Sequence, residues 1–211
     1  MKITGSFLKI EDDKEKIKTL AQETDQIHFD IMDGIFTENK TLEIDKVKEN
    51  LVNLKSDIDI HLMVKNVKEY VDKVLIFNPQ VITFHIEASE NPNEFINYIK
   101  GKKVKVGIAI NPKTNLEKIY PYLKSIDLVL IMSVQAGKGG QKFIDISSRI
   151  DDIYNYRKKN KLNYIIEVDG GINNETIKKV KKADLIVVGS YITDSNNYKK
   201  QVEELRKCYN E

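Results

Sequence analysis

Several amino-acid types that stabilise or anchor proteins are scarce in this sequence. Its 211 residues include no tryptophan, four prolines and one cysteine. Because a single cysteine cannot form an internal disulfide, Cys208 excludes a disulfide-stapled fold and fits a reducing compartment, so we expect a cytoplasmic protein. No apolar run approaches the roughly 18 residues that a membrane span requires, which argues against a transmembrane protein. The amino terminus turns acidic early, which argues against a signal peptide.

A large net charge of either sign is missing as well, since the formal net charge is +2 at pH 7. Lys and Arg number 34 against 32 Asp and Glu, and both signs are interspersed along the chain. We therefore expect neither a nucleic-acid partner nor an anionic membrane partner. Hydrophobic residues make up 41% and charged residues 31%, which is typical of a soluble globular protein. Any anionic ligand must then be held by local features.

Short apolar, β-branched runs alternate with longer Lys- and Glu-rich segments whose apolar residues recur three or four positions apart. The runs predict strands at Ile3–Leu8, Ile27–Met32, Ile58–Val64, Val81–His85, Val104–Ile110, Leu128–Val134, Tyr164–Asp169 and Leu185–Val188. The segments predict helices at Asp13–Gln22, Asp45–Leu54, Val67–Phe77, Pro92–Lys100, Asn115–Leu123, Ile144–Lys159, Asn174–Lys182 and Tyr198–Cys208. Pro121 would shorten or break the fifth helix.

Eight strand and helix units in this length average about 26 residues each, close to the lower limit of a (β/α)8 barrel. We therefore predict an α/β fold, a TIM barrel, with residues 1–211 forming a single catalytic domain. An open, doubly wound sheet of eight strands is the alternative that periodicity leaves open. Asn91 before Pro92, and Asn174 before a periodic run, indicate two helix starts.

The three histidines, His28, His61 and His85, each lie in or at the end of a predicted strand. In a barrel the carboxyl ends of the strands form the face on which active sites are built. His28 and Asp30 are two residues apart and so point to the same side of their strand, while Asp169 ends the seventh strand. Two imidazoles and two carboxylates suit Zn²⁺, Fe²⁺, Mn²⁺ or Co²⁺. On spacing alone, buried core histidines and aspartates that cap turns remain the alternative.

The methionines repeat this placement. Apart from Met1 they are Met32, Met63 and Met132, each near the carboxyl end of a predicted strand. Methionine in a strand normally fills gaps in the core. The coincidence with the His and Asp positions favours an apolar lining beside the polar site equally well.

Glycines gather after the last three predicted strands, at Gly139, Gly140, Gly170, Gly171 and Gly189. One glycine pair is usually a tight turn. In (β/α)8 barrels, however, the loops after the seventh and eighth strands commonly bind phosphate through backbone N–H groups. Glycine elements after consecutive late strands therefore favour a phosphate site.

Seven motifs, HFDIMDGIF, IHLMV, FHIEA, VGIAINPKT, IMSVQAGKGGQKFI, EVDGGIN and VVGS, follow one another in order. From Ser6 to about Ser190 the sequence thereby resembles the ribulose-phosphate 3-epimerase family. The resemblance implies an enzyme that interconverts D-ribulose 5-phosphate and D-xylulose 5-phosphate by two-base proton transfer at C3 through an enediolate. It implies Asp30 and Asp169 as the acid and base. It also implies one divalent metal ion, Zn, Fe, Mn or Co, bound by His28, Asp30, His61 and Asp169.

The resemblance further implies which residues contact a sugar-phosphate substrate. Ser6 and His61 would contact its polar groups, and the three methionines would line the reacting carbon. The phosphate loops would supply Gly139, Gly140, Gly170, Gly171, Gly189 and Ser190. We also expect the chain to form a homo-oligomer.

Some positions depart from the family pattern. Ala136 and Lys138 replace the proline and phenylalanine of Pro-Gly-Phe-Gly-Gly-Gln, DGHFVPN reads DGIFTEN, and GSAIF reads GSYIT. These loops leave open a 3-epimerase of another ketose phosphate, such as a hexulose 6-phosphate. A non-catalytic sugar-phosphate-binding barrel is a further alternative. All four proposed ligands are present, however, and a binding module would not need the two aspartates.

Overall fold

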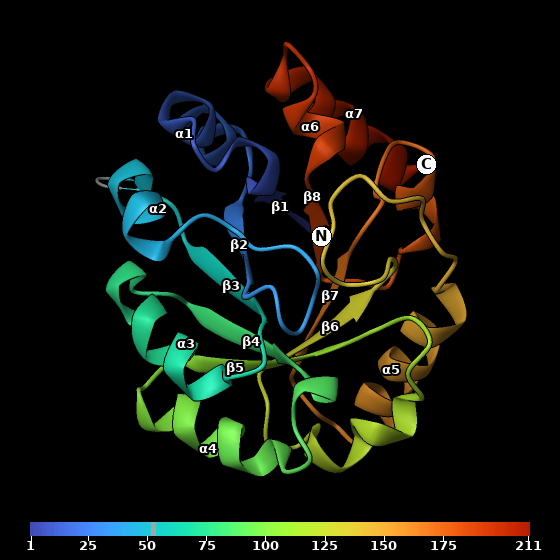
Figure 1. The fold of residues 1–211 in the computed structure, drawn as a ribbon. Coiled ribbons are helices and arrows are strands. Elements are labelled where there is room, and N and C mark those ends of the chain that lie inside the picture. Colours follow the sequence, from blue (N-terminus) through green and yellow to red (C-terminus); the bar gives the residue numbers. More distant parts are fainter. Residues whose placement is uncertain (52–53) are drawn as a thin grey trace.

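Eight parallel strands close into a barrel in the order of the sequence (Figure 1). The computed structural model describes residues 1–51 and 54–211. Its strands are β1 (Lys2–Ser6), β2 (Gln26–Met32), β3 (Ile58–Met63), β4 (Val81–His85), β5 (Lys105–Ile110), β6 (Leu128–Met132), β7 (Ile165–Asp169) and β8 (Leu185–Val188). Because β1 pairs with β8, the open sheet is excluded and the predicted (β/α)8 barrel is confirmed.

Helices surround the barrel (Figure 1). They are α1 (Lys14–Glu23), α2 (Ile44–Leu51), α3 (Val67–Val74), α4 (Pro92–Gly101), α5 (Ser147–Lys159), α6 (Ser190–Thr193) and α7 (Tyr198–Asn210). Short 3-10 turns occupy η1 (Leu8–Ile10), η2 (Leu75–Phe77), η3 (Ile86–Ala88), η4 (Leu116–Lys118), η5 (Tyr120–Tyr122) and η6 (Thr176–Lys179). The predicted helix Asp45–Leu54 includes residues 52 and 53, which lie outside the described residues. Within the described ranges no helix is both long and apolar enough to cross a bilayer.

The predicted helix Asn115–Leu123 is wrong in kind. The segment forms only η4 and η5, two 3-10 turns separated by Ile119. Pro121 lies in η5 and has no N–H to donate, so a continuous α-helix would lose a backbone hydrogen bond there. The connection between β5 and β6 therefore keeps its length but not its predicted structure.

The predicted helix Asn174–Lys182 is also wrong in kind, since it contains only the 3-10 turn η6. Three of its residues are β-branched, which disfavours helix. Asn173, not Asn174, accepts the first N–H groups, including that of Thr176 at 2.9 Å. Asn91 does precede α4, but its side chain caps no N–H group.

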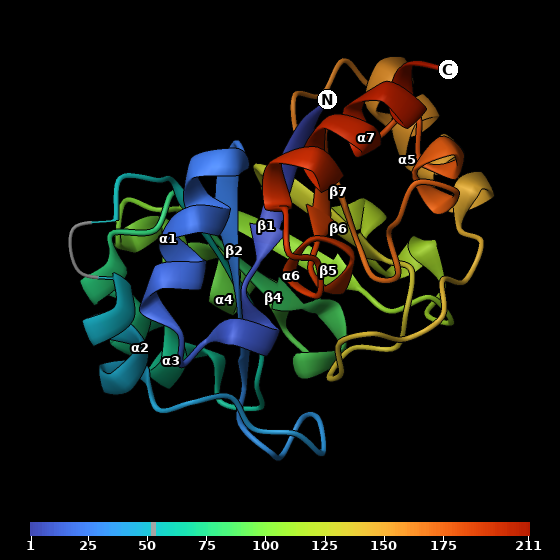
Figure 2. The ribbon, with the colours of Figure 1, turned by 90° about the horizontal axis from the view of Figure 1, so that it is seen from above.

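The barrel interior is polar near one rim. Side chains two apart on a strand share a face, and on β2 and β3 the inward ones are His28, Asp30, Asp59 and His61, all buried. The carboxyl ends of parallel strands lie at the same rim, so these groups meet the end of β7. Figure 2 shows the loops after β2 and β6 at one end of the molecule and both chain termini at the other.

Candidate active site

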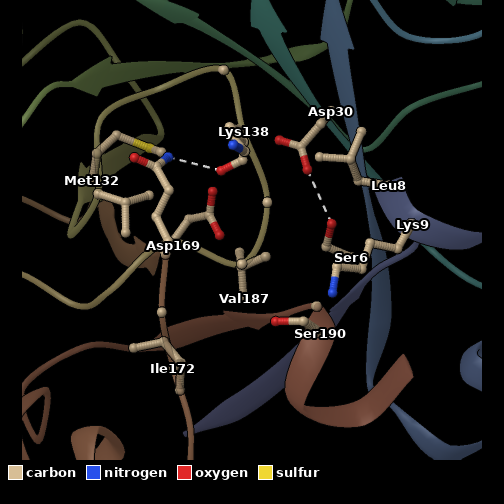
Figure 3. A pocket seen from close by; sticks show the side chains of 18 of the residues that line it. Ser6, Leu8, Lys9, Asp30, Met132, Lys138, Asp169, Ile172, Val187 and Ser190 are labelled. Carbon is tan, nitrogen blue, oxygen red and sulfur yellow. Dashed lines mark hydrogen bonds between the residues drawn. The ribbon is translucent and has the colours of Figure 1, made fainter. Parts of the chain in front are cut away.

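A cavity opens at the carboxyl ends of the strands (Figure 3). Its walls come from β1, β2, β3, β6, β7 and β8 and from the segments that follow β1, β6, β7 and β8. The lining residues are Ser6, Leu8, Lys9, Asp30, Met63, Met132, Val134, Gln135, Gly137, Lys138, Gly139, Gly140, Gln141, Asp169, Gly170, Gly171, Ile172, Val187, Gly189, Ser190 and Thr193. The cavity therefore joins carboxylates, methionines and the glycine loops in one space.

Four side chains that the sequence singled out meet beneath this cavity. His28, Asp30, His61 and Asp169 each offer one ligand atom, and these atoms lie within 4.8 Å of one another. Asp30 Oδ1 is 3.2 Å from His28 Nε2 and 3.0 Å from His61 Nδ1. Both histidines are fully buried, whereas Asp169 is partly exposed. Such a group could hold a metal ion.

The hydrogen bonds of His28 fit a cation at this place. Its Nδ1 lies 2.7 Å from Asp59 Oδ2, and since a carboxylate only accepts, Nδ1 carries the hydrogen. In the uncharged ring Nε2 is then a bare nitrogen. Nε2 is buried, has no hydrogen-bond partner in the described part of the chain, and faces Asp30. A bare nitrogen beside a carboxylate oxygen is the donor pair that a divalent cation requires.

The two carboxyl groups of the cavity hold their protons with different strength. Burial disfavours the Asp30 carboxylate, but the adjacent His28 and His61 outweigh it and hold the pKa of Asp30 well below its usual range. Burial and the charge of Asp30 raise the pKa of Asp169 to about 7. Neighbouring carboxyl groups with separated pKa values are typical of acid and base pairs.

Ser6, at the end of β1, orients one of these carboxyl groups. Its hydroxyl donates to Asp30 Oδ2 at 3.0 Å (Figure 3). Ser6 is also paired in register with His28 across β1 and β2. Ser6 therefore holds Oδ2 of the Asp30 carboxylate, and Oδ1 faces His28 Nε2 and His61 Nδ1.

Comparison with known proteins agrees with this geometry. The profile of the "Ribulose-phosphate 3 epimerase family" matches residues 3–193. A ribulose-phosphate 3-epimerase of Helicobacter pylori is 36% identical over 186 residues, which cover 86% of this chain and 85% of that protein. One from Escherichia coli K12 is 34% identical over 211 residues, covering 97% and 92%.

The chain belongs to the ribulose-phosphate 3-epimerase family. The family resemblance and the enzyme class expected from the sequence, an epimerase acting on a carbohydrate, are thereby confirmed. Among solved structures, a 3-hexulose-6-phosphate synthase from Salmonella typhimurium superposes with a TM-score of 0.71 over 99% of this chain and 98% of that one, at 14% identity. That likeness shows the barrel fold alone.

The three methionines predicted to line the site border two different hollows in the structure. Met63 and Met132 line the cavity, and Met32 lies beside it at the end of β2, paired in register with Met63. Met32 ends β2, where its N–H donates to Thr41 Oγ1 at 3.2 Å, and it lines a separate hollow with Thr41 and residues of α2 and α3.

The glycine loops of the epimerase are tightly fitted. Gly170 and Gly171 have φ values of +115° and +62°, which residues other than glycine rarely adopt. A Cβ on Gly171 would lie 2.7 Å from the backbone nitrogen of Phe143, in the loop after β6. A substitution at Gly171 would therefore move that loop, so Gly189 offers a cleaner test of phosphate binding.

Sequence reasoning missed some groups around the cavity. Lys9 lies at the rim, pairs with Asp194 at 2.7 Å and lies near the position of a Cβ on Gly140. No spacing rule pointed to it, because one lysine among many carries no pattern. Asp59 could have been found from its spacing. It stands two residues before His61 on one strand, as His28 stands two residues before Asp30 on another.

Proposed function

We propose that this protein is a metal-dependent 3-epimerase that interconverts D-ribulose 5-phosphate and D-xylulose 5-phosphate. The observation that carries the proposal is the pair Asp30 and Asp169, which come from β2 and β7 and face one cavity (Figure 3). The same cavity is bordered by glycine loops. A sugar-phosphate-binding barrel without catalysis would need the loops but not two converging carboxyl groups.

Inversion at a carbon next to a ketone requires removing its proton on one face and returning a proton to the other. Asp30, whose carboxylate accepts a hydrogen bond from Ser6, takes or returns the proton on one face. Asp169 acts on the opposite face. Each turnover leaves one carboxyl group protonated and the other ionised, and the roles exchange with the direction of reaction. The carbanion formed in between is an enediolate.

His28, Asp30, His61 and Asp169 would hold one divalent ion, Zn, Fe, Mn or Co. When bound, such an ion polarises the substrate carbonyl and stabilises the negative charge of the enediolate oxygens. Met63 and Met132 present apolar surface to the same cavity and limit the access of water.

The phosphate group lies, in this proposal, among the backbone N–H groups of the loops after β6, β7 and β8. The backbone N–H groups here are not covered by side chains of their own residues, because these are Gly140, Gly170, Gly171 and Gly189. Ser190 adds a hydroxyl. The distance between these loops and the carboxyl pair decides which carbon of the chain is inverted. A ketose phosphate fits this arrangement, because its ketone and its phosphate lie toward opposite ends of the carbon chain.

The decisive experiment follows deuterium entry at C3 and product formation together, with D-ribulose 5-phosphate in heavy water. Metal-depleted protein should show neither, and restoring one equivalent of divalent ion should restore both. A hexulose 6-phosphate is run in parallel, because Lys138 in the cavity wall and the exposed Ile35 alter the loops that face the sugar. Faster turnover of the hexulose phosphate would reassign the substrate, and binding without exchange on either sugar would reassign the protein as a binding barrel.

Gly189→Ala is expected to raise KM by about tenfold, the effect of about 1.4 kcal/mol, while kcat changes little. A Cβ there would make only ordinary contacts of 3.6–3.8 Å with Ser6, so folding should be unaffected, but the added methyl would occupy the cavity wall. Steady-state kinetics measure the effect. Gly101→Ala is the control, because a Cβ at Gly101, at the end of α4, meets nothing within 4 Å. An unchanged KM in folded Gly189→Ala would move the phosphate elsewhere.

A further inference from the structure

His85 and Glu87 lie next to the proposed metal cluster without belonging to it or to the cavity. His85 ends β4 and is fully buried, and Glu87 follows in η3. His85 Nε2 is 2.9 Å from His61 Nε2, and His85 Nδ1 is 3.0 Å from Glu87 Oε2. At the other side of His61, Nδ1 faces Asp30 Oδ1 at 3.0 Å. The four side chains form one continuous chain of contacts.

Glu87 determines where the hydrogens of this chain lie. A carboxylate only accepts hydrogen bonds, so His85 Nδ1 carries a hydrogen and donates it to Glu87. In the uncharged His85 ring Nε2 is then an acceptor. The contact between the two Nε2 atoms needs one hydrogen, which must come from His61. In an uncharged His61 ring Nδ1 is then bare where it faces Asp30 Oδ1, and a cation bound between these two atoms would satisfy both.

Glu87 itself is held by donors only. Its Oε1 accepts the backbone N–H of Asn111 at 2.9 Å and the Thr114 hydroxyl at 2.5 Å. The carboxylate thus accepts three hydrogen bonds from three directions. A glutamine of the same shape would present an NH2 group to at least one of these donors. The site therefore selects a carboxylate, not merely a polar side chain of that length.

We infer that Glu87 and His85 are positioning residues that fix the tautomer of His61, so that Nδ1 is the nitrogen presented to the metal ion. The inference rests on the proposed function only in naming His61 as a ligand. His28 is fixed in the opposite sense, because Asp59 holds its Nδ1 and leaves Nε2 free. The two histidines would thus bind a cation through different ring nitrogens, set by the buried Asp59 for His28 and by the partly exposed Glu87, acting through His85, for His61. Such outer partners typically change metal affinity by about 10–100-fold.

The same group connects the cluster to the loop over the cavity. Asn111, whose N–H is bound by Glu87, accepts the backbone N–H of Ala136 through its side-chain oxygen at 3.0 Å. Ala136 begins the glycine-containing loop after β6. Loss of the Glu87 carboxylate should therefore weaken metal binding first and substrate binding second.

The tautomers are directly measurable because the chain has only three histidines. Two-bond ¹⁵N–¹H spectra of ¹⁵N-histidine-labelled protein, without metal and with Zn²⁺, report the state of each ring nitrogen. In the zinc-loaded protein we expect hydrogens on His28 Nδ1, His61 Nε2 and His85 Nδ1, and none on His61 Nδ1. A hydrogen on His61 Nδ1 in the zinc-loaded wild-type protein would overturn the inference, whether or not the protein proves to be an epimerase.

Variants then separate positioning from simple packing. Glu87→Gln should shift the hydrogen of His61 toward Nδ1 and weaken Zn²⁺ binding by about 10–100-fold. The matched control is Thr114→Val, which removes one donor to Glu87 but leaves the His85 contact, and it should keep both tautomer and affinity. His85→Gln, whose amide oxygen can accept from His61 Nε2, should retain more affinity than His85→Leu.

Three results would contradict the inference: unchanged zinc affinity in folded Glu87→Gln, equal losses in Glu87→Gln and Thr114→Val, or equal losses in the two His85 variants. If Glu87→Gln does not fold, the wild-type tautomers and the His85 pair still decide. Failure of the proposed function would look different. It would appear as absent turnover of ketose phosphates with the expected tautomers and metal affinities intact.

Discussion

Asp169→Asn is expected to lower net epimerisation by about 10²–10⁴-fold, the usual cost of removing a general acid or base, while proton exchange continues on one face of C3. An amide cannot take or return the proton, but it has nearly the shape of the carboxyl group. Asp30 keeps its hydrogen bond from Ser6 and its place beside His28 and His61, so it can still remove a proton from its own face and return it there.

The measurement follows substrate in heavy water and quantifies deuterium at C3 in both recovered substrate and product. Exchange into substrate without inversion would support carboxyl groups on opposite faces. Product formation at the wild-type rate would remove Asp169 from the mechanism. Metal content is determined in parallel, because Asp169 is also a proposed ligand. Asp151→Asn is the matched control, since Asp151 lies on the outer helix α5 and pairs with Lys182 at the surface.

The fold could be predicted from the sequence because each unit of a barrel repeats the same local pattern. Strands β4 and β8 have the predicted bounds, and the others differ by a residue or two at their ends. The predictions for two of the connecting segments failed, because each segment has helical periodicity but also contains residues that disfavour a helix. Pro121 breaks the segment before β6, and β-branched residues limit the one before β8 to a single turn. Spacing of apolar residues shows which face is buried, but not how many turns a connection forms.

The site could be predicted only where strand geometry dictates it. Side chains two apart on parallel strands must share a face, so His28 with Asp30 and the end of β7 were bound to meet at one rim. Met32 shares that spacing and ends β2 in register with Met63, and its N–H donates to Thr41 Oγ1. Contacts such as Glu87 with Thr114 depend on where loops after different strands come together, and no single stretch of sequence encodes that.

His28→Ala and His61→Ala are each expected to lower the affinity for the divalent ion by about 10²–10³-fold. If four ligands share an apparent binding free energy of about 10–16 kcal/mol, one ligand accounts for roughly a quarter of it. Asp59→Asn should cost less, about 10–100-fold, because Asp59 contacts His28 Nδ1 and not the ion. From strongest to weakest metal binding, the expected order is therefore wild type, then Asp59→Asn, then the two alanine variants.

Zinc or cobalt titrations against a competing chelator measure these affinities, with metal per folded protein determined after gel filtration. Circular dichroism establishes that each variant keeps the wild-type secondary structure, since both histidines are fully buried. Asp151→Asn again serves as the control and should bind metal like the wild type. Full occupancy in both alanine variants would show that the ion lies elsewhere. Loss in His28→Ala with full retention in His61→Ala would instead point to the second buried group, His28, Asp59 and Glu167, whose ligand atoms also lie within 4.8 Å of one another.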